Sequence, residues 1–169
     1  MTRLGTAWRV AAAAGVLALA AGCGGSSTPE RDPATVRSEV MTQSAAVMNT
    51  AHVTGQQVGA FPPRSTPTDL SCDDGDDDSP DRVLSQMWTV HSKDNTALGK
   101  GMANLAASLP GQGWKIVRNG PDASASRNQE IQATHLATKI QLDVTWEKNL
   151  KYGDPLVQFA VSSPCFRTK

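Results

Sequence analysis

Apolar residues recur with the period of an amphipathic helix in two stretches of the chain. The first stretch follows Asp32 and Pro33. An aspartate can cap a helix, and proline is favoured at the first position because its missing N–H would have no partner there. The apolar stripe consists of Val36, Val40, Val47, Met48 and Ala51. We therefore predict a helix over residues 32–51.

The second helical stretch begins after Asp94 and Asn95, either of which can cap it. Its stripe consists of Leu98, Met102, Leu105, Ala106 and Leu109, and Pro110-Gly111 ends it. Gly99 and Gly101 weaken the first turns by up to about 1 kcal/mol each relative to alanine. Packing against the rest of the protein must therefore hold that end.

Alternation with period two predicts strands in the second half of the chain. The segments are 84–91, 114–118, 140–147 and 157–161, the last continuing toward Cys165. In the third, Ile140, Leu142, Val144 and Trp146 share one side, as in a strand with one buried face. The last two strands should pair as a hairpin. Residues 131–137 alternate only loosely and fit either a strand or a helix.

The order of these elements predicts an α+β domain, with a mainly antiparallel sheet of about four or five strands and two helices packed on one face. We place this single domain at residues 32–169. It comprises the helix at 32–51, a connector at 52–69 rich in Gly, Pro, Ser and Thr, and a sheet-forming body at 70–169. Trp88, Trp114 and Trp146 fall at apolar strand positions and are expected in the core. The alternative for them is an aromatic platform for a ligand.

Residues 1–22 have the pattern of an export signal. Arg3 and Arg9 precede an apolar run from Val10 to Gly22, and Cys23 follows. The run is shorter than the roughly 20 residues of a membrane-spanning helix. Leu19-Ala-Ala-Gly-Cys23 resembles a bacterial lipobox, in which the cysteine receives diacylglycerol and becomes the first residue after cleavage; the usual Leu at the third place before it is Ala20.

We therefore expect a protein anchored by lipid at Cys23 to the outer side of the cell membrane, with residues 23–31 as a flexible tether. The alternatives are an ordinary thiol in a signal cut elsewhere and an uncleaved anchor. Without Arg3 and Arg9 the chain keeps 14 basic and 16 acidic residues. Such a body is not attracted to an anionic membrane, so acyl chains such as palmitate would hold it there.

The remaining cysteines, Cys72 and Cys165, are expected to form one disulfide, because an exported compartment favours oxidation. A catalytic cysteine is the weaker alternative, since neither cysteine has a neighbouring histidine or a CxxC partner.

An acidic segment, Asp73 to Asp81, holds six of the sixteen acidic residues of the chain. Oxygen ligands at Asp74, Asp76, Asp78 and Asp81 could hold Ca²⁺. The segment differs from an EF-hand loop: counted from Asp74, it has no glycine at the sixth place and no glutamate at the twelfth. The simpler interpretation is a solvated loop without a cofactor.

Balanced charge, with sixteen basic and sixteen acidic residues, argues against nucleic-acid binding. His52, His91 and His135 are scattered without metal-ligand spacing. The sequence contains no GxSxG, SxxK, GxGxxG or Walker motif. A non-enzymatic role is therefore the first expectation.

The chain resembles small actinobacterial cell-envelope lipoproteins, of which the mycobacterial Lpp-type lipoproteins are the nearest comparison. The likeness rests on the lipobox-like end, the alanine-rich body, Gly113-Trp114 after a helix, and the closing Ser163-Pro164-Cys165-Phe166. It implies an envelope address and a disulfide-tied α+β body, and it assigns no catalytic residue.

Three functions follow as hypotheses, of which a hydrolase is the least favoured because no catalytic motif supports it. The first is a non-enzymatic lipoprotein that presents a sheet face or loop to an envelope protein or cell-wall glycan. The second is a carrier of a small ligand or metal ion that uses the acidic loop or a cavity between helices and sheet. The oligomeric state stays open.

The anchor is tested by mass spectrometry of the protein isolated from its host. We expect the mature chain to begin at Cys23 and to carry the mass of fatty acyl chains on that residue. An unmodified Cys23 sulfur in mature material would overturn the expectation.

Overall fold

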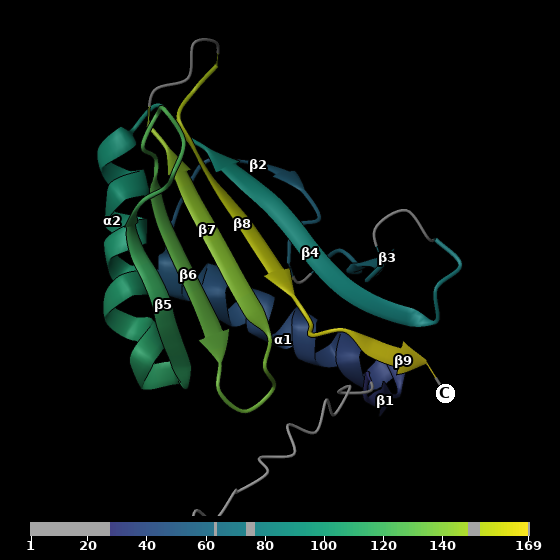
Figure 1. The fold of residues 1–169 in the computed structure, drawn as a ribbon. Helices are drawn as coiled ribbons and strands as arrows, with labels where there is room; N and C mark the ends of the chain where they lie inside the picture. The colour runs from purple at the N-terminus through teal and green to yellow at the C-terminus, as the bar shows by residue number, and fades with distance from the viewer. Residues whose placement is uncertain (1–27, 63, 74–76, 149–152, 169) are drawn as a thin grey trace, which may run out of the picture.

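The computed structural model describes residues 28–62, 64–73, 77–148 and 153–168. Two α-helices and nine strands lie in these residues (Figure 1). In chain order the elements are β1 (Glu30–Arg31), α1 (Pro33–Ala51), β2 (Gln56–Gly59), β3 (Thr68–Ser71), β4 (Asp81–His91), α2 (Asn95–Ser108), a 3-10 turn (Leu109–Gln112), β5 (Trp114–Pro121), β6 (Gln129–His135), β7 (Gln141–Glu147), β8 (Leu156–Ser162) and β9 (Phe166–Thr168).

All nine described strands join one sheet, in the order β1-β9-β4-β8-β7-β6-β5, with β2 and β3 also paired to β4. Only β1 and β9 pair in parallel within this sheet; the other pairs are antiparallel. The predicted α+β class and mostly antiparallel sheet are confirmed. Strands β7 and β8 form the predicted antiparallel pair, and residues 129–135 are a strand rather than a helix.

The predicted count of four or five strands is wrong. The additional strands β1, β2, β3 and β9 are two to four residues long. The first lies in the expected tether, β2 in the expected connector, β3 across the connector's end, and β9 after the last predicted strand. Three of them pair with β4, which is eleven residues long: β2 and β3 pair along it, and β9 pairs with its first two residues, before β8 begins. The fourth, β1, pairs with β9. Strands this short carry too few residues to show an alternating pattern.

Both helices begin at the predicted caps. The Asp32 carboxylate accepts hydrogen bonds from the backbone N–H groups of Ala34 (3.3 Å) and Thr35 (3.0 Å). The Asp94 carboxylate accepts from the N–H groups of Thr96 and Ala97, both at 3.0 Å. Each carboxylate satisfies donors that have no partner within the helix.

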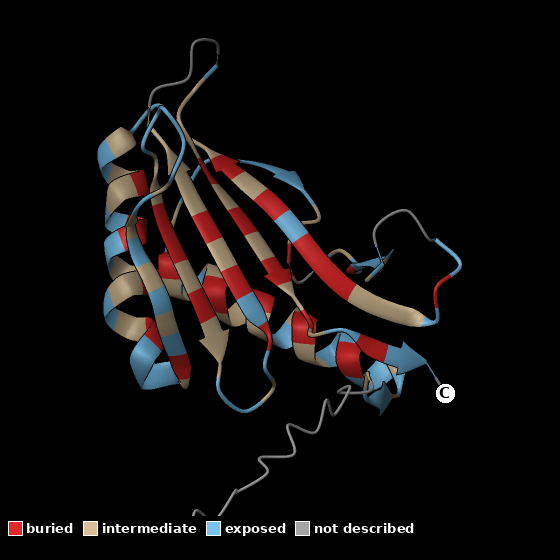
Figure 2. Ribbon diagram, viewed as in Figure 1, coloured by how far each residue is buried: buried red, intermediate tan, exposed pale blue. Residues whose placement is uncertain are grey.

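The core lies between one face of the sheet and the two helices, which cover that same face (Figure 2). Along β8 the odd-numbered residues are buried and the even-numbered ones are partly exposed. Trp88 of β4 stacks on Phe159 of β8 with ring centroids 4.8 Å apart and planes 3° from parallel. The side chains buried in this layer include Val36, Val40, Val47, Leu84, Leu98, Leu105, Ile131, Leu142, Val144, Val157 and Val161.

The tryptophans divide between core and surface. Trp88 and Trp114 are buried, as predicted. Trp146 lies on the apolar side of β7 but remains partly exposed, at the edge of the core. Trp146 therefore packs against the core from its edge, whereas the other two lie within it.

Close packing explains why α2 contains Gly99 and Gly101, which lower its intrinsic helix stability. A Cβ atom on Gly99 would lie 2.6 Å from Cη2 of Trp146, and one on Gly101 would collide with Cγ2 of Val53. Any larger residue would push the helix away from the sheet or from the end of α1. The glycines thus allow the approach that stabilises this end of α2.

Cys72 and Cys165 form the predicted disulfide, with Cα atoms 6.1 Å apart. The bond closes a loop across 93 positions of the chain and ties the end of β3 to the segment before β9.

Removing the bond with Cys72→Ser and Cys165→Ser should lower the free energy of unfolding by on the order of 4 kcal/mol, because the unfolded chain regains the entropy of a large loop. Urea unfolding of the oxidised protein and the double variant measures this loss. A reductant should lower the free energy of unfolding of the oxidised protein to that of the double variant. It should leave the stability of the double variant unchanged. Equal unfolding midpoints without reductant would contradict the prediction.

Candidate functional site

The sheet face opposite the helices bears no covering element among the described residues, and we call it the open face (Figures 1 and 2). Register places side chains from β5, β6, β7, β8 and β4 in rows across it. Its members are Lys115, Val117, Arg118, Glu130, Gln132, Thr134, Gln141, Asp143, Thr145, Gln158, Ala160, Ser162, Ser85, Met87 and Thr89, with Val58 of β2 and Leu70 of β3 continuing the rows beyond β4.

A polar network orders the part of the open face that β5, β6 and β7 form. The Arg118 guanidinium lies 2.9 Å from the Glu130 carboxylate. The Gln132 amide donates to Glu130 (2.9 Å) and to Asp143 (3.1 Å). These contacts join three neighbouring strands, so the charged side chains are held in one position instead of sampling several rotamers in solvent.

Aliphatic side chains flank this network. The strongly exposed large apolar residues among the described ones are Val58 (48%), Leu70 (45%), Met87 (48%), Val117 (59%) and Leu136 (54%). Four of the five belong to the open face; only Leu136 lies elsewhere, in the connection between β6 and β7. Single exposed apolar residues are ordinary, but their collection on one face indicates a contact surface.

Val117 owes its exposure to an irregularity in β5. The register with β6 shifts between Ile116 and Arg118, which leaves Val117 without a Cα partner. Such a bulge turns two successive side chains toward the same face. Val117 therefore stands beside Arg118 on the open face instead of pointing into the core.

Two shallow hollows lie on the open face, on either side of β8. One, of about 220 Å³, is bordered by Val117, Gln132, Thr134, Gln141, Asp143, Ala160 and Ser162. The other, of about 280 Å³, is bordered by Val58, Gly59, Met87, Thr89 and Gln158. Ala160 is the low point between them, because its small side chain pairs with Asp143 on one side and Met87 on the other.

The open face is rich in hydrogen-bonding groups. Amides and hydroxyls outnumber its charges, and several are paired to each other, as with Ser85 and Ser162 at 2.8 Å. His91 lies at the end of β4, where its Nε2 is 3.1 Å from Oγ1 of Thr89. His52 caps the end of α1, and His135 bonds Thr138 at the end of β6. The arrangement suits recognition of another surface.

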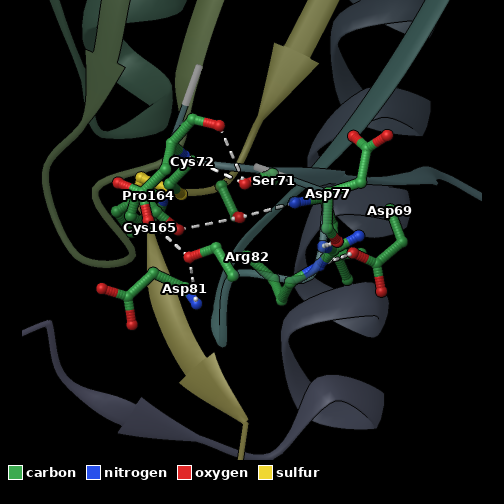
Figure 3. A network of polar contacts seen from close by, with 12 residues as sticks. Asp69, Ser71, Cys72, Asp77, Asp81, Arg82, Pro164 and Cys165 are labelled. Carbon is green, nitrogen blue, oxygen red and sulfur yellow. Dashed lines mark hydrogen bonds and ion pairs between the residues drawn. A yellow bond between two sulfur atoms is a disulfide. The ribbon is translucent and has the colours of Figure 1, made fainter. Parts of the chain in front are cut away.

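The described part of the acidic segment folds back onto the protein beside the disulfide (Figure 3). Arg82 pairs with Asp69 at 2.7 Å and donates to the backbone carbonyl of Asp77 at 2.8 Å. The backbone N–H of Cys72 donates to the carbonyl of Asp81, and Ser79 donates to the Asp73 carboxylate. These contacts hold the ends of the acidic segment between β3 and β4.

The predicted calcium ligands are only partly described. Asp74 and Asp76 lie outside the described residues, as does the predicted lipid site Cys23. Asp78 is exposed, and both Asp81 oxygens accept hydrogen bonds from Arg167 (2.8 and 3.2 Å) while Thr28 donates to one of them (2.8 Å). Within the described ranges no three His, Cys, Asp or Glu side chains gather as a metal site. Calcium binding stays a prediction.

Sequence reasoning missed the main apolar members of the open face. Val58 lies in the segment expected as a connector, and Val117 lies in a strand whose bulge has no sequence signal. The period-two alternation predicted over residues 84–91 puts Met87 on the side opposite Trp88, as observed, and this alternation is the signal that locates the face.

Comparisons with protein-family models, with curated proteins and with solved structures found no match to the chain. Neither described α-helix has the length and apolar character needed to cross a membrane. Function is therefore argued from the geometry of the sheet and helices.

Asp81 should titrate below an ordinary aspartate. The hydrogen bond from Arg167 lowers its pKa most, the one from Thr28 lowers it further, and partial desolvation opposes them. Arg167→Gln should raise the Asp81 pKa toward its usual value, seen in a carboxyl NMR titration. The wild type should be more stable than this variant above the ordinary aspartate pKa, and the difference should vanish as the pH falls through the lowered pKa.

The control is Arg127→Gln, which removes the same charge from an exposed residue between β5 and β6. It should leave the Asp81 titration unchanged. An Asp81 pKa that is equal in the wild type and in Arg167→Gln would show that the ion pair does not set it.

Proposed function

We propose that this chain is a lipid-anchored extracytoplasmic protein that binds a partner protein of the cell envelope through its open face, without catalysis. The observation that carries the proposal is the collection of Val58, Leu70, Met87 and Val117 on one uncovered sheet face. The lipobox-like sequence ending at Cys23 supports the location.

The composition of the open face favours a protein over a glycan. Its exposed apolar groups are aliphatic, and none of the described side chains on it is aromatic. Sugar rings pack best on flat aromatic faces, whereas aliphatic groups around a hydrogen-bonding centre are common at protein contacts. A partner protein would bury Met87 and Val117 and bond the exposed amides between them.

The polar network of β5, β6 and β7 favours specificity. Arg118, Glu130, Gln132 and Asp143 already hold one another, so binding does not have to immobilise long side chains. A partner with complementary polar groups would be preferred over one that offers only apolar surface.

The proposal is tested by photo-crosslinking in intact host cells. A photoreactive amino acid replaces Met87 or Val117 in the full chain, and the control position is Ala107, which is exposed on α2 away from the open face. We expect one discrete adduct from positions 87 and 117 and none of that mass from position 107.

Ala160→Trp adds the second arm of the test. The indole would fill the low point between the two hollows without entering the core, so the adduct from position 87 should fall to background. Ala107→Trp is the matched control and should leave it intact. Thermal unfolding checks that both variants stay folded. Equal adducts from all three positions, or none from 87 and 117, would overturn the proposal.

A further inference from the structure

A groove of about 270 Å³ lies on the helix side of the sheet, between α2 and the ends of β5, β6 and β7. Its lining consists of Gly99, Met102, Ala103, Ala106, Asn119, Gln129, Trp146 and Lys148. Small residues of α2 leave space opposite the strands, and buried Met102 forms an apolar floor. The groove is separate from the open face, because its strand residues point to the opposite side of the sheet.

Trp146 is held in one orientation in this groove. Its indole N–H donates to the Asn95 side-chain oxygen at 2.9 Å, and the Asn95 amide donates to the backbone carbonyl of Lys148 at 3.2 Å. The far edge of the ring lies against Gly99, where even a methyl group would collide. A partly exposed indole fixed at both ends is a rigid platform that loses little freedom when a ligand covers it.

Lys148 gives the groove its charge. Its ammonium lies 4.4 Å from the centre of the Trp146 ring. Among the described residues that line the groove, it is the only one with a charged side chain, and no carboxylate there neutralises it. A negatively charged ligand group would gain a partner beside the indole.

The opposite wall offers amide N–H donors and an amide oxygen acceptor. The Gln129 amide donates to the Asn119 oxygen at 2.9 Å. This contact leaves the Asn119 amide as a donor and the Gln129 oxygen as an acceptor. A hydroxyl group can satisfy both at once, because it donates and accepts.

We propose that this groove binds a saccharide that carries a carboxylate. The apolar C–H face of the sugar ring packs against Trp146 and Met102, its hydroxyls bond Asn119 and Gln129, and its carboxylate pairs with Lys148. This inference concerns a different surface from the proposed partner-binding face, so either one can fail without the other.

The test measures binding by NMR of the mature, detergent-solubilised protein labelled with ¹⁵N-tryptophan. The probes are two matched pairs, methyl glucuronide with methyl glucoside and N-acetylmuramic acid with N-acetylglucosamine. In each pair only the first carries a carboxylate. We expect at least one acidic sugar to shift the Trp146 indole signal in a saturable way, with the signals of buried Trp88 and Trp114 unchanged. Its neutral counterpart should bind about tenfold more weakly.

Variants separate the contacts. Lys148→Met should weaken binding of the acidic sugar about tenfold and leave the affinity for its neutral counterpart unchanged. The control, Lys100→Met, removes the same charge from exposed α2 surface outside the groove and should change neither affinity. Asn119→Ala should weaken both sugars. Acetate alone, lacking hydroxyls and a ring, should not shift Trp146.

Three results would overturn the inference. These are no saturable Trp146 shift with either acidic sugar, equal affinity for both members of each pair, and a loss of affinity in Lys100→Met as large as that in Lys148→Met. Photo-crosslinking at positions 87 and 117 does not depend on any of these results.

Discussion

Burial of one apolar sheet face beneath two helices is the constraint on which the rest of the structure depends. The stacked rings of Trp88 and Phe159 lie at the middle of that layer, where β4 meets β8. Because strand side chains alternate, placing these rings inward turns Met87 and Ala160 outward. The open face is therefore a direct consequence of how the core is packed.

Long elements with a regular pattern could be predicted from the sequence, because their burial repeats over several turns or pleats. Helices α1 and α2, their aspartate caps and strands β4, β7 and β8 belong to this group. The disulfide could also be predicted, because the chain has two cysteines besides the predicted lipid site at Cys23. In each case a local rule and the tertiary structure agree.

The remaining features depend on contacts between distant segments. Strands β2 and β3 form because β4 offers them partners, and the bulge at Val117 is set by how β5 pairs with β6. Trp146 follows the same alternation as Leu142 and Val144, yet it stays partly exposed because β7 passes the end of the helical layer at Gly99. The candidate sites therefore needed the three-dimensional arrangement, although alternation already indicated which face Met87 would occupy.

The contacts at Asp81 have a mechanical consequence for a force applied to the N-terminal end of the described residues. Thr28 bonds Asp81, the Arg167 backbone bonds Pro29, and Arg167 also pairs with Asp81. Tension arriving along the leading segment would first meet this three-way junction, where β1 must slide along β9 before α1 is pulled. Because the disulfide joins Cys165, just before β9, to Cys72, just after β3, this junction is also linked covalently to a strand that pairs with β4.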